Sequence, residues 1–243
     1  MAERQRADRL LVARGLFESR ARAQAAIAAG LVTAGGKVVL KPSDEIPTDA
    51  AIEAQPEHPW VSRGGVKLAG ALERYPIEID DKVCLDVGAS TGGFTEVLLN
   101  CGASLVHAID VGRGQLHPSL QGHPKIISRE ETDIRTLAGK RLDVRPTVVV
   151  IDVSFISLKL VLPVALELAA VPTQLLALIK PQFEAPRAAI KKGIVRDAAV
   201  HKAVCDDVAA FAASLGCTDI KVFDSPITGG DGNREFFLGA RRG

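Results

Sequence analysis

Two oppositely charged side chains follow two apolar runs of this 243-residue chain. Asp152 comes directly after TVVVI, and Lys180 comes directly after LLALI. The carboxyl ends of parallel strands meet at one edge of a sheet, so we expect these charges to lie close together beside a ligand crevice. A lysine beside a carboxylate at such an edge can take part in proton transfer. A solvated strand end is the alternative for either residue alone, and two opposite charges at neighbouring strand ends favour a site.

A glycine-rich turn, DVGASTGGFTEVL, joins another apolar run to a helical pattern. Turns of this kind commonly hold an anion or a nucleotide at the start of the helix. The outer glycines have the spacing of a P-loop, but Phe94 stands where the lysine of a P-loop would be. A dinucleotide fingerprint needs a second glycine where this chain has Ser90. Neither phosphate signature is complete, which disfavours a triphosphate or a dinucleotide as the ligand.

An acidic residue after the next apolar run indicates which nucleotide is bound. Asp110 ends SLVHAID, where a carboxylate can accept hydrogen bonds from a ribose diol. A ribose-binding acid beside a loop not built for pyrophosphate predicts S-adenosyl-L-methionine as the cofactor. Asp86 is expected to position its ammonium group, directly or through water, and Asp133 either accepts from the adenine amine or caps a helix. The predicted cofactor-binding residues are Asp86, Gly88, Ser90, Gly92, Gly93, Asp110 and Asp133.

The candidate site residues follow apolar runs, and they come together only if these runs are strands of one parallel sheet that is covered by helices on both faces. From residue 60 onward, apolar runs alternate with helical patterns, which is the rhythm of a doubly wound α/β fold. The expected strands are residues 83–87, 105–109, 125–128, 147–151, 175–179, 220–224 and 235–240. The expected helices include residues 94–101, 158–170 and 198–215. The sequence therefore predicts a seven-stranded, mostly parallel sheet.

A small basic module precedes this sheet. Residues 7–14 and 20–29 have helical patterns, and LVTAGGKVVL predicts two short strands around a glycine pair. Residues 1–41 carry eight basic and three acidic side chains, a net charge of +5, which leaves about −4 for the remainder. This asymmetry favours a polyanion as ligand, with a solvated basic face as the alternative. The proline-rich, acidic segment 42–59 is expected to be a linker, and the domains are expected at residues 1–58 and 59–243.

The composition excludes several classes of protein. Mean hydropathy is +0.16, but the chain has no run of about 20 apolar residues such as a membrane span requires. The charged N-terminus lacks a following apolar segment, so no secretory signal is expected. The four cysteines lack metal-ligand spacing and are expected to be buried thiols in a reducing compartment. We therefore expect a cytoplasmic protein without a metal.

The motifs, taken in order, resemble a known family. RADRLLVARGLFESRARAQAAIAAGLVTAGGKVV resembles the S-four-type RNA-binding domain of ribosomal proteins and RNA-modifying enzymes. VSRGGVKL, LDVGASTGGFTEVLL, AIDVGRGQL, DVSFISL, IKPQFE and GNREFFLGARR resemble the hemolysin A (TlyA-type) family of FtsJ-like ribosomal RNA 2′-O-methyltransferases. This resemblance covers nearly the whole chain and implies a Rossmann-like class I S-adenosylmethionine-dependent methyltransferase fold. EETDIR departs from the family pattern, which bears only on the adenine contact at Asp133.

The resemblance also implies a catalytic set, formed by Lys67, Asp152, Lys180 and Glu235. A ribose 2′-hydroxyl is a weak nucleophile, and a lysine whose pKa is lowered by burial and a second cation can accept its proton. Lys180 is the candidate base and Lys67 the second cation. The two carboxylates would orient the lysines while opposing the lowering of the pKa, and the sequence does not decide which effect prevails. The implied substrate is the ribose of cytidine in 16S rRNA, 23S rRNA or both.

Basic side chains of both modules are the candidate RNA contacts. They are Arg9, Arg14, Arg20, Arg22, Lys37, Arg187, Lys191 and Lys192. The last three lie in a long connection after Lys180 that is either an RNA-contacting lid or a surface loop without a role. The expected partners are ribosomal RNA or ribosomal subunits, with no membrane, and the protein is expected to be a monomer or a weak dimer.

Three other functions remain open at this point. An RNA-binding protein without catalysis is disfavoured by the presence of all four polar positions. A membrane-lytic hemolysin is disfavoured because the sequence has no strongly amphipathic basic helix. A base methyltransferase is disfavoured because no base-reading motif follows the fourth expected strand.

Overall fold

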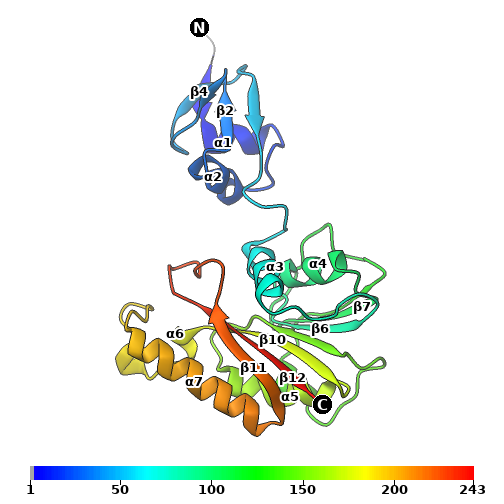
Figure 1. The fold of residues 1–243 in the computed structure, drawn as a ribbon. Coiled ribbons are helices and arrows are strands. Elements are labelled where there is room, and N and C mark those ends of the chain that lie inside the picture. Colours follow the sequence, from blue (N-terminus) through cyan, green and yellow to red (C-terminus); the bar gives the residue numbers. More distant parts are fainter. Residues whose placement is uncertain (1–2) are drawn as a thin grey trace. The chain divides into compact units, whose positions relative to one another are not determined.

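The computed structural model describes residues 3–243, and the chain forms two compact units, Met1–Pro59 and Trp60–Gly243. The smaller unit has one apolar core. The larger unit has two, which lie on opposite faces of its sheet. Figure 1 shows the course of the chain through both units. No helix within residues 3–243 is both long and apolar enough to cross a bilayer.

The smaller unit packs two helices against short strands. The helices are α1 (Ala7–Ala13) and α2 (Arg20–Ala28), and the strands are β1 (Arg4–Arg6), β2 (Val32–Ala34), β3 (Lys37–Val38), β4 (Glu45–Pro47) and β5 (Ile52–Ala54). β1 pairs with β4, and the other three form an antiparallel sheet in the order β3–β2–β5. Ser19 caps α2 by accepting a hydrogen bond from the Arg22 amide at 3.3 Å. Gly35 and Gly36 both have positive φ angles, 56° and 74°, as a two-residue hairpin turn requires.

The segment that we expected to be a linker, residues 42–59, contains two strands. β4 buries Ile46, which is 8% exposed, and β5 pairs with β2. The abundance of proline and acidic residues masked these strands, because Pro42 precedes β4 and Pro47 ends it without interrupting a ladder. Strands of three residues are also too short to give a periodic signal.

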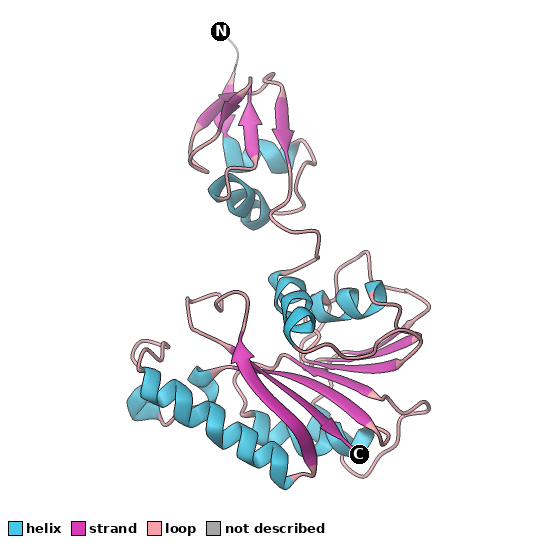
Figure 2. Ribbon diagram, viewed as in Figure 1, coloured by secondary structure: helices cyan, strands magenta, loops and turns pink. Residues whose placement is uncertain are grey.

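The larger unit is built on a seven-stranded sheet, shown in Figure 2. Its strands are β6 (Val83–Val87), β7 (Leu105–Ile109), β8 (Ile126–Arg129), β9 (Val148–Ile151), β10 (Thr173–Ile179), β11 (Cys217–Asp224) and β12 (Phe236–Arg242). The strand order is β11-β12-β10-β9-β6-β7-β8, and β12 is antiparallel to both of its neighbours. The predicted seven-stranded, mostly parallel sheet is thus confirmed. The chain runs outward from β6 through β7 and β8 and returns to the other side at β9, so β6 and β9 form the switch point where such sheets bind ligands.

Helices cover both faces of this sheet (Figure 1). One face carries α3 (Arg63–Arg74) and α4 (Gly93–Asn100), with Leu68 and Leu98 in its core. The other face carries α5 (Leu158–Leu168) and α7 (Ala198–Ser214), with Leu162 and Val208 in its core. Three further helices are short: η1 (Ile134–Leu137), α6 (Pro181–Glu184) and η2 (Arg187–Ala189). Helix α3 was not predicted, because the glycine pair in VSRGGVKL weakens a helical pattern.

Candidate active site

A cavity of about 460 Å³ opens at the carboxyl ends of β6, β7, β8 and β9. Four connections contribute to its wall, each one directly after a strand of the parallel sheet. They supply Gly88 and Ser90, then Asp110, Val111 and Gln115, then Thr132 to Arg135, and finally Asp152 to Ile156. The cavity therefore lies at the switch point, where the topology leads us to expect a ligand.

The glycines of the turn after β6 have separate roles. Gly88 has φ +83°, and a Cβ atom there would overlap the backbone oxygen of Asp152, so the connections after β6 and β9 touch at this glycine. Gly92 would overlap Leu120, and Gly93 would overlap the hydroxyl of Ser62. The structure thus brings Gly88 and Ser90 to the cavity, while Gly92 and Gly93 allow neighbouring elements to pack against α4.

The carboxylate of Asp110 is fixed at the cavity wall. One oxygen accepts a hydrogen bond from the Ser90 amide at 2.8 Å, and the other accepts from the Gly112 amide at 2.6 Å. A carboxylate offers about four lone-pair positions, so both oxygens can still accept from a ligand. The side chain is therefore held where a ribose diol could reach it.

Asp86 lies behind the cavity and does not line it. Its side chain is fully buried, and one oxygen accepts a hydrogen bond from the Thr95 hydroxyl at 2.6 Å. The other oxygen has no hydrogen-bond partner among the described residues. Burial raises the pKa of Asp86 to about 7, against the opposing effect of the Thr95 hydrogen bond. Any direct contact between Asp86 and a ligand would need the wall to move.

Asp133 lines the cavity but is engaged by its own helix. It caps η1, accepting from the Arg135 amide at 2.9 Å, and it also forms an ion pair with the Arg135 guanidinium at 2.6 Å. These hydrogen bonds hold the pKa of Asp133 below its usual value. Of the two roles considered for Asp133, the structure shows the helix cap.

The four predicted catalytic residues form two ion pairs. Lys180 Nζ lies 2.6 Å from Asp152 Oδ1, and Lys67 Nζ lies 2.6 Å from Glu235 Oε2. Both lysines and Glu235 are buried, with exposed fractions of 8% for Lys67, 9% for Lys180 and 3% for Glu235. Buried ion pairs are a poor source of net stability, because desolvation offsets the attraction between the charges. Two such pairs side by side are therefore better explained by function than by stability.

Strand register brings three of these residues to one edge. Ile179 of β10 faces Phe236 of β12, so Lys180 and Glu235 adjoin this facing pair at the ends of the two strands. Asp152 follows β9, which runs parallel to β10 on its other side. The carboxyl edge of the sheet therefore carries both carboxylates next to Lys180.

The fourth residue, Lys67, comes from helix α3. This helix can approach α4 closely because small residues meet there: a Cβ atom on Gly93 would lie 2.8 Å from the amide nitrogen of Gly65. A Cβ atom on Gly65 would in turn overlap the ring of Trp60. The glycine pair of VSRGGVKL thus sets the depth of α3 and brings Lys67 within reach of Glu235.

Three residues that the sequence analysis did not single out also line the cavity. Ser154 accepts a hydrogen bond from Lys180 Nζ at 2.8 Å. Phe155 is 91% exposed, has φ +64°, and its ring centroid lies 5.0 Å from that of Phe183. Gln115 sits in a loop whose amides bind the carboxylate of Glu130 at 2.6–3.1 Å. The motif DVSFISL could have indicated Ser154 and Phe155, because they directly follow Asp152 and Val153 in it.

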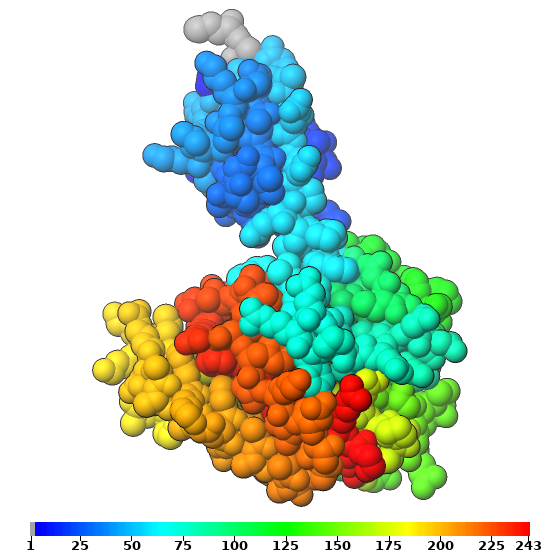
Figure 3. Space-filling view, in the orientation of Figure 1, coloured from blue at the N-terminus to red at the C-terminus, as the bar shows by residue number. Residues whose placement is uncertain are grey.

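The basic connection after α6 is tied to the loop before Glu235. Asn233, only 1% exposed, donates to the Gly193 carbonyl at 2.9 Å and accepts from the Val195 amide at 3.2 Å. Figure 3 shows the surfaces of these two segments, gold and red-orange, in contact. The predicted RNA contacts Arg187, Lys191 and Lys192 are all exposed on this connection. A buried amide thus links the basic connection to the strand end that carries Glu235.

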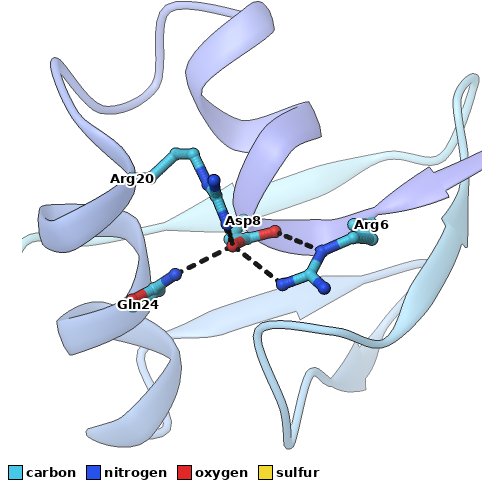
Figure 4. Close-up of polar contacts among 4 residues, drawn as sticks. All are labelled: Arg6, Asp8, Arg20 and Gln24. Carbon is cyan, nitrogen blue, oxygen red and sulfur yellow. Dashed lines mark hydrogen bonds and ion pairs between the residues drawn. The ribbon is translucent and has the colours of Figure 1, made fainter.

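The predicted RNA contacts of the smaller unit differ in their surroundings. Arg20 pairs with the fully buried Asp8 at 2.7 Å, together with Arg6 and Gln24 (Figure 4). Arg14 donates to the carbonyl oxygens of Ala50 and Thr48. Arg22 is half-buried and lies 3.8 Å from Glu18, whereas Arg9 and Lys37 are exposed. Arg14 and Arg20 therefore hold the unit together, and Arg9 and Lys37 point to solvent.

The four cysteines are free thiols that differ in burial. Cys84, Cys205 and Cys217 are buried free thiols, but Cys101 is exposed, because it caps the C-terminal end of α4 at the surface. The prediction of four buried thiols is wrong for this residue. Within residues 3–243, no group of three or more His, Cys, Asp or Glu side chains could hold a metal ion.

A doubly wound sheet, a glycine turn at its switch point and a carboxylate at the next strand end define a Rossmann-like nucleotide-binding fold. Residues 60–242 match the FtsJ-like methyltransferase family, and the chain belongs to this family. Residues 5–52 match the S4 domain.

Several relatives align with nearly the whole chain, across both the S4 and the methyltransferase regions. The chain is 42% identical to the 16S/23S rRNA (cytidine-2′-O)-methyltransferase TlyA of Mycobacterium tuberculosis, over 99% of this chain and 91% of that protein. It is 36% identical to hemolysin A of Brachyspira hyodysenteriae, over 95% of this chain and 97% of that protein. A solved structure from Streptococcus thermophilus that carries the name hemolysin is 39% identical, with a TM-score of 0.76 over 100% of this chain and 90% of that one.

Proposed function

We propose that this protein transfers a methyl group from S-adenosyl-L-methionine to the 2′-hydroxyl of cytidine in ribosomal RNA. The observation that carries the proposal is the Lys180–Asp152 ion pair, 2.6 Å long, directly beside the cavity at the switch point. Membership of the FtsJ-like family and the activity named for the Mycobacterium tuberculosis relative support the same reaction.

The cavity fits S-adenosyl-L-methionine. Its volume of about 460 Å³ suits a nucleoside-sized ligand. Gly88 and Ser90 line the cavity, and the Asp110 carboxylate is available to the ribose hydroxyls. When bound, the cofactor supplies a methyl group on a positively charged sulfur, which keeps the bonding electrons when the methyl group leaves.

The chain's own residues hold and deprotonate the substrate hydroxyl. Lys180 is the final acceptor of its proton, and Asp152 fixes the orientation of the Lys180 side chain. Lys67 adds a second positive charge near the developing oxyanion, and Glu235 orients Lys67. Alignment of hydroxyl and methyl group within the cavity contributes as well, since well-oriented reactants gain about 7–11 kcal/mol.

An exposed aromatic ring on the larger unit and exposed cations on each of the two units are proposed to hold the RNA. Phe155, almost fully exposed beside Asp152, offers a face on which an unstacked base can lie. The exposed cations Arg9, Lys37, Arg187, Lys191 and Lys192 offer phosphate contacts. The partners would be ribosomal subunits or their RNA in the cytoplasm, with the protein acting as a monomer or a weak dimer.

The test is transfer of tritiated methyl groups to separated small and large ribosomal subunits, and to protein-free RNA from each. We expect cofactor-dependent incorporation into at least one of these substrates. Lys159→Arg is the matched control for substitutions at Lys180, because Lys159 pairs with Asp207 at the surface. No incorporation into any of them by protein that binds the cofactor would contradict the proposal.

A further inference from the structure

Ser154 lies between the cavity and Lys180. Ser154 lines the cavity, whereas Lys180 is 9% exposed and does not line it. Lys180 Nζ reaches two side chains that do line the cavity, Asp152 at 2.6 Å and Ser154 at 2.8 Å. A hydroxyl group in the cavity thus meets Asp152 and Ser154 before it meets the lysine.

Of these two side chains, only the serine can pass a proton on while remaining neutral. A hydroxyl donates one hydrogen bond and accepts two, so it can accept from the substrate and donate to an amine at the same time. An ionised carboxylate only accepts, and Asp152 already serves Lys180 as its counter-ion. The residue types therefore indicate that Asp152 orients the Lys180 side chain and that Ser154 transfers the proton.

Both ends of the Ser154–Lys180 hydrogen bond are tied to the same short helix. Lys180 caps the N-terminus of α6, and Glu184 is its last residue. The partly buried carboxylate of Glu184 accepts from the Ser157 hydroxyl at 2.5 Å and from the Leu158 amide at 2.7 Å. These bonds hold the 152–157 connection against α6, which fixes the distance between serine and lysine.

We propose that Ser154 is a proton relay between the substrate 2′-hydroxyl and Lys180, an inference that rests on the proposed function. As the 2′-oxygen bonds to the methyl carbon, its proton moves to Ser154 Oγ. Lys180 Nζ donates to Ser154 Oγ in the structure, so Lys180 first releases this proton to solvent, and the original hydroxyl proton of Ser154 then moves to the freed amine. Ser154 ends as a hydroxyl and Lys180 as an ammonium, which returns its proton to solvent after the product leaves.

The experiment compares Ser154→Ala, Ser154→Thr and the wild type in single-turnover methyl transfer, in mixtures of H₂O and D₂O. Loss of a proton-transfer group typically lowers the rate by about 10²–10⁴-fold, and we expect Ser154→Ala to fall in this range. Ser154→Thr keeps the hydroxyl and should stay within about tenfold of the wild type. A plot of the wild-type rate against deuterium content should be curved, because two protons move in the step. The same plot for the residual rate of Ser154→Ala should be a straight line.

Ser214→Ala is the matched control, because it removes an exposed hydroxyl that donates only to the Phe211 carbonyl at the end of α7, and its rate should equal that of the wild type. Calorimetric affinity for S-adenosyl-L-methionine verifies that each variant is folded and should be unchanged in Ser154→Ala. A Ser154→Ala rate within about twofold of the wild type, or a Ser154→Thr loss as large as that of alanine, would overturn the relay alone. A wild type that transfers no methyl group would overturn the relay and the proposed function together.

Discussion

At the scale of single residues, the candidate site is a set of charges that the fold has taken out of water. Asp152 and Lys180 were predicted from their places after two apolar runs, because strand ends in a parallel sheet converge. Lys67 and Glu235 came only from family resemblance, since no spacing rule links a helix before the sheet to its antiparallel strand. Ser154 was missed because its role depends on a 2.8 Å contact with Lys180 that no pattern specifies.

Asp110 should contribute directly to cofactor affinity. Replacing Asp110 with alanine removes a charged acceptor at the cavity wall, which should weaken binding of S-adenosyl-L-methionine by about 1–3 kcal/mol. Isothermal titration calorimetry measures this loss. Asp143→Ala, an exposed carboxylate that does not line the cavity, should leave the affinity unchanged. Equal affinities for the Asp110 variant and the wild type would remove ribose recognition from this residue.

Asp86 should make stability depend on pH near neutrality. Its pKa is raised to about 7 in the folded state by burial, from about 3.9 in the unfolded chain. The folded state therefore binds more protons between these values, and the free energy of unfolding contributed by Asp86 falls as pH rises from about 4 to 7. Asp86→Asn cannot titrate, so the stability difference between the two proteins should shift across this window in urea unfolding. A difference that stays constant from pH 4 to 8 would contradict the burial argument.

At the scale of elements, small and polar residues decide how close helices and connections come. Gly65 and Gly93 let α3 approach α4, and this approach brings Lys67 to Glu235. In the smaller unit, the buried Asp8 joins β1, α1 and α2 through Arg6, Arg20 and Gln24. A charged side chain that a sequence pattern assigns to ligand binding can therefore instead stabilise the fold, as Arg20 does.

Asp8→Asn should destabilise the smaller unit. Hydrogen bonds from Arg6 and then Arg20 hold the pKa of Asp8 well below its usual range. Breaking a buried ion pair costs about 3–5 kcal/mol, and we expect about 3 because both arginines are partly exposed. Hydrogen exchange of amides in α1 and α2, measured in the full chain, should show the loss.

The pH dependence at Asp8 has the opposite sign to that at Asp86. A lowered folded pKa gives stability that is present above the unfolded value of about 3.9 and is lost as pH falls further. Protection of α1 and α2 in the wild type should thus decline below about pH 4, while Asp8→Asn lacks this decline. Identical acid profiles for the two proteins would show that the buried carboxylate does not stabilise the unit.

At the scale of the whole molecule, the sequence predicted the α/β fold, the seven strands and the two-helix module. Long apolar runs such as residues 147–151 and 175–179 carry a strong signal because the sheet buries them on both faces. The short strands β4 and β5 and the helix α3 carry weak signals, since proline, acidic residues or glycine obscure their patterns. Asp86 shows the limit for the site: its type and position fit a ligand contact, but burial behind the cavity is set by packing.

The exposed cations of the smaller unit should bind RNA through phosphates. Replacing both Arg9 and Lys37 with alanine should lower affinity for the ribosomal substrate and reduce the slope of log affinity against log salt by about 1 to 2. Filter binding over a range of salt concentrations measures both. Lys202→Ala, a lysine of α7 already paired with Asp206, should change neither. An unaltered salt slope in the double variant would assign these cations to a solvated surface.

The measurement that tests the central claim most directly is mass spectrometry of the nucleosides released from RNA methylated by the wild type and by Lys180→Arg. We predict 2′-O-methylcytidine from the wild type. The arginine variant should yield almost none, because a guanidinium cannot accept a proton near neutral pH. A methyl group on the base, or near wild-type yield from Lys180→Arg, would contradict the account.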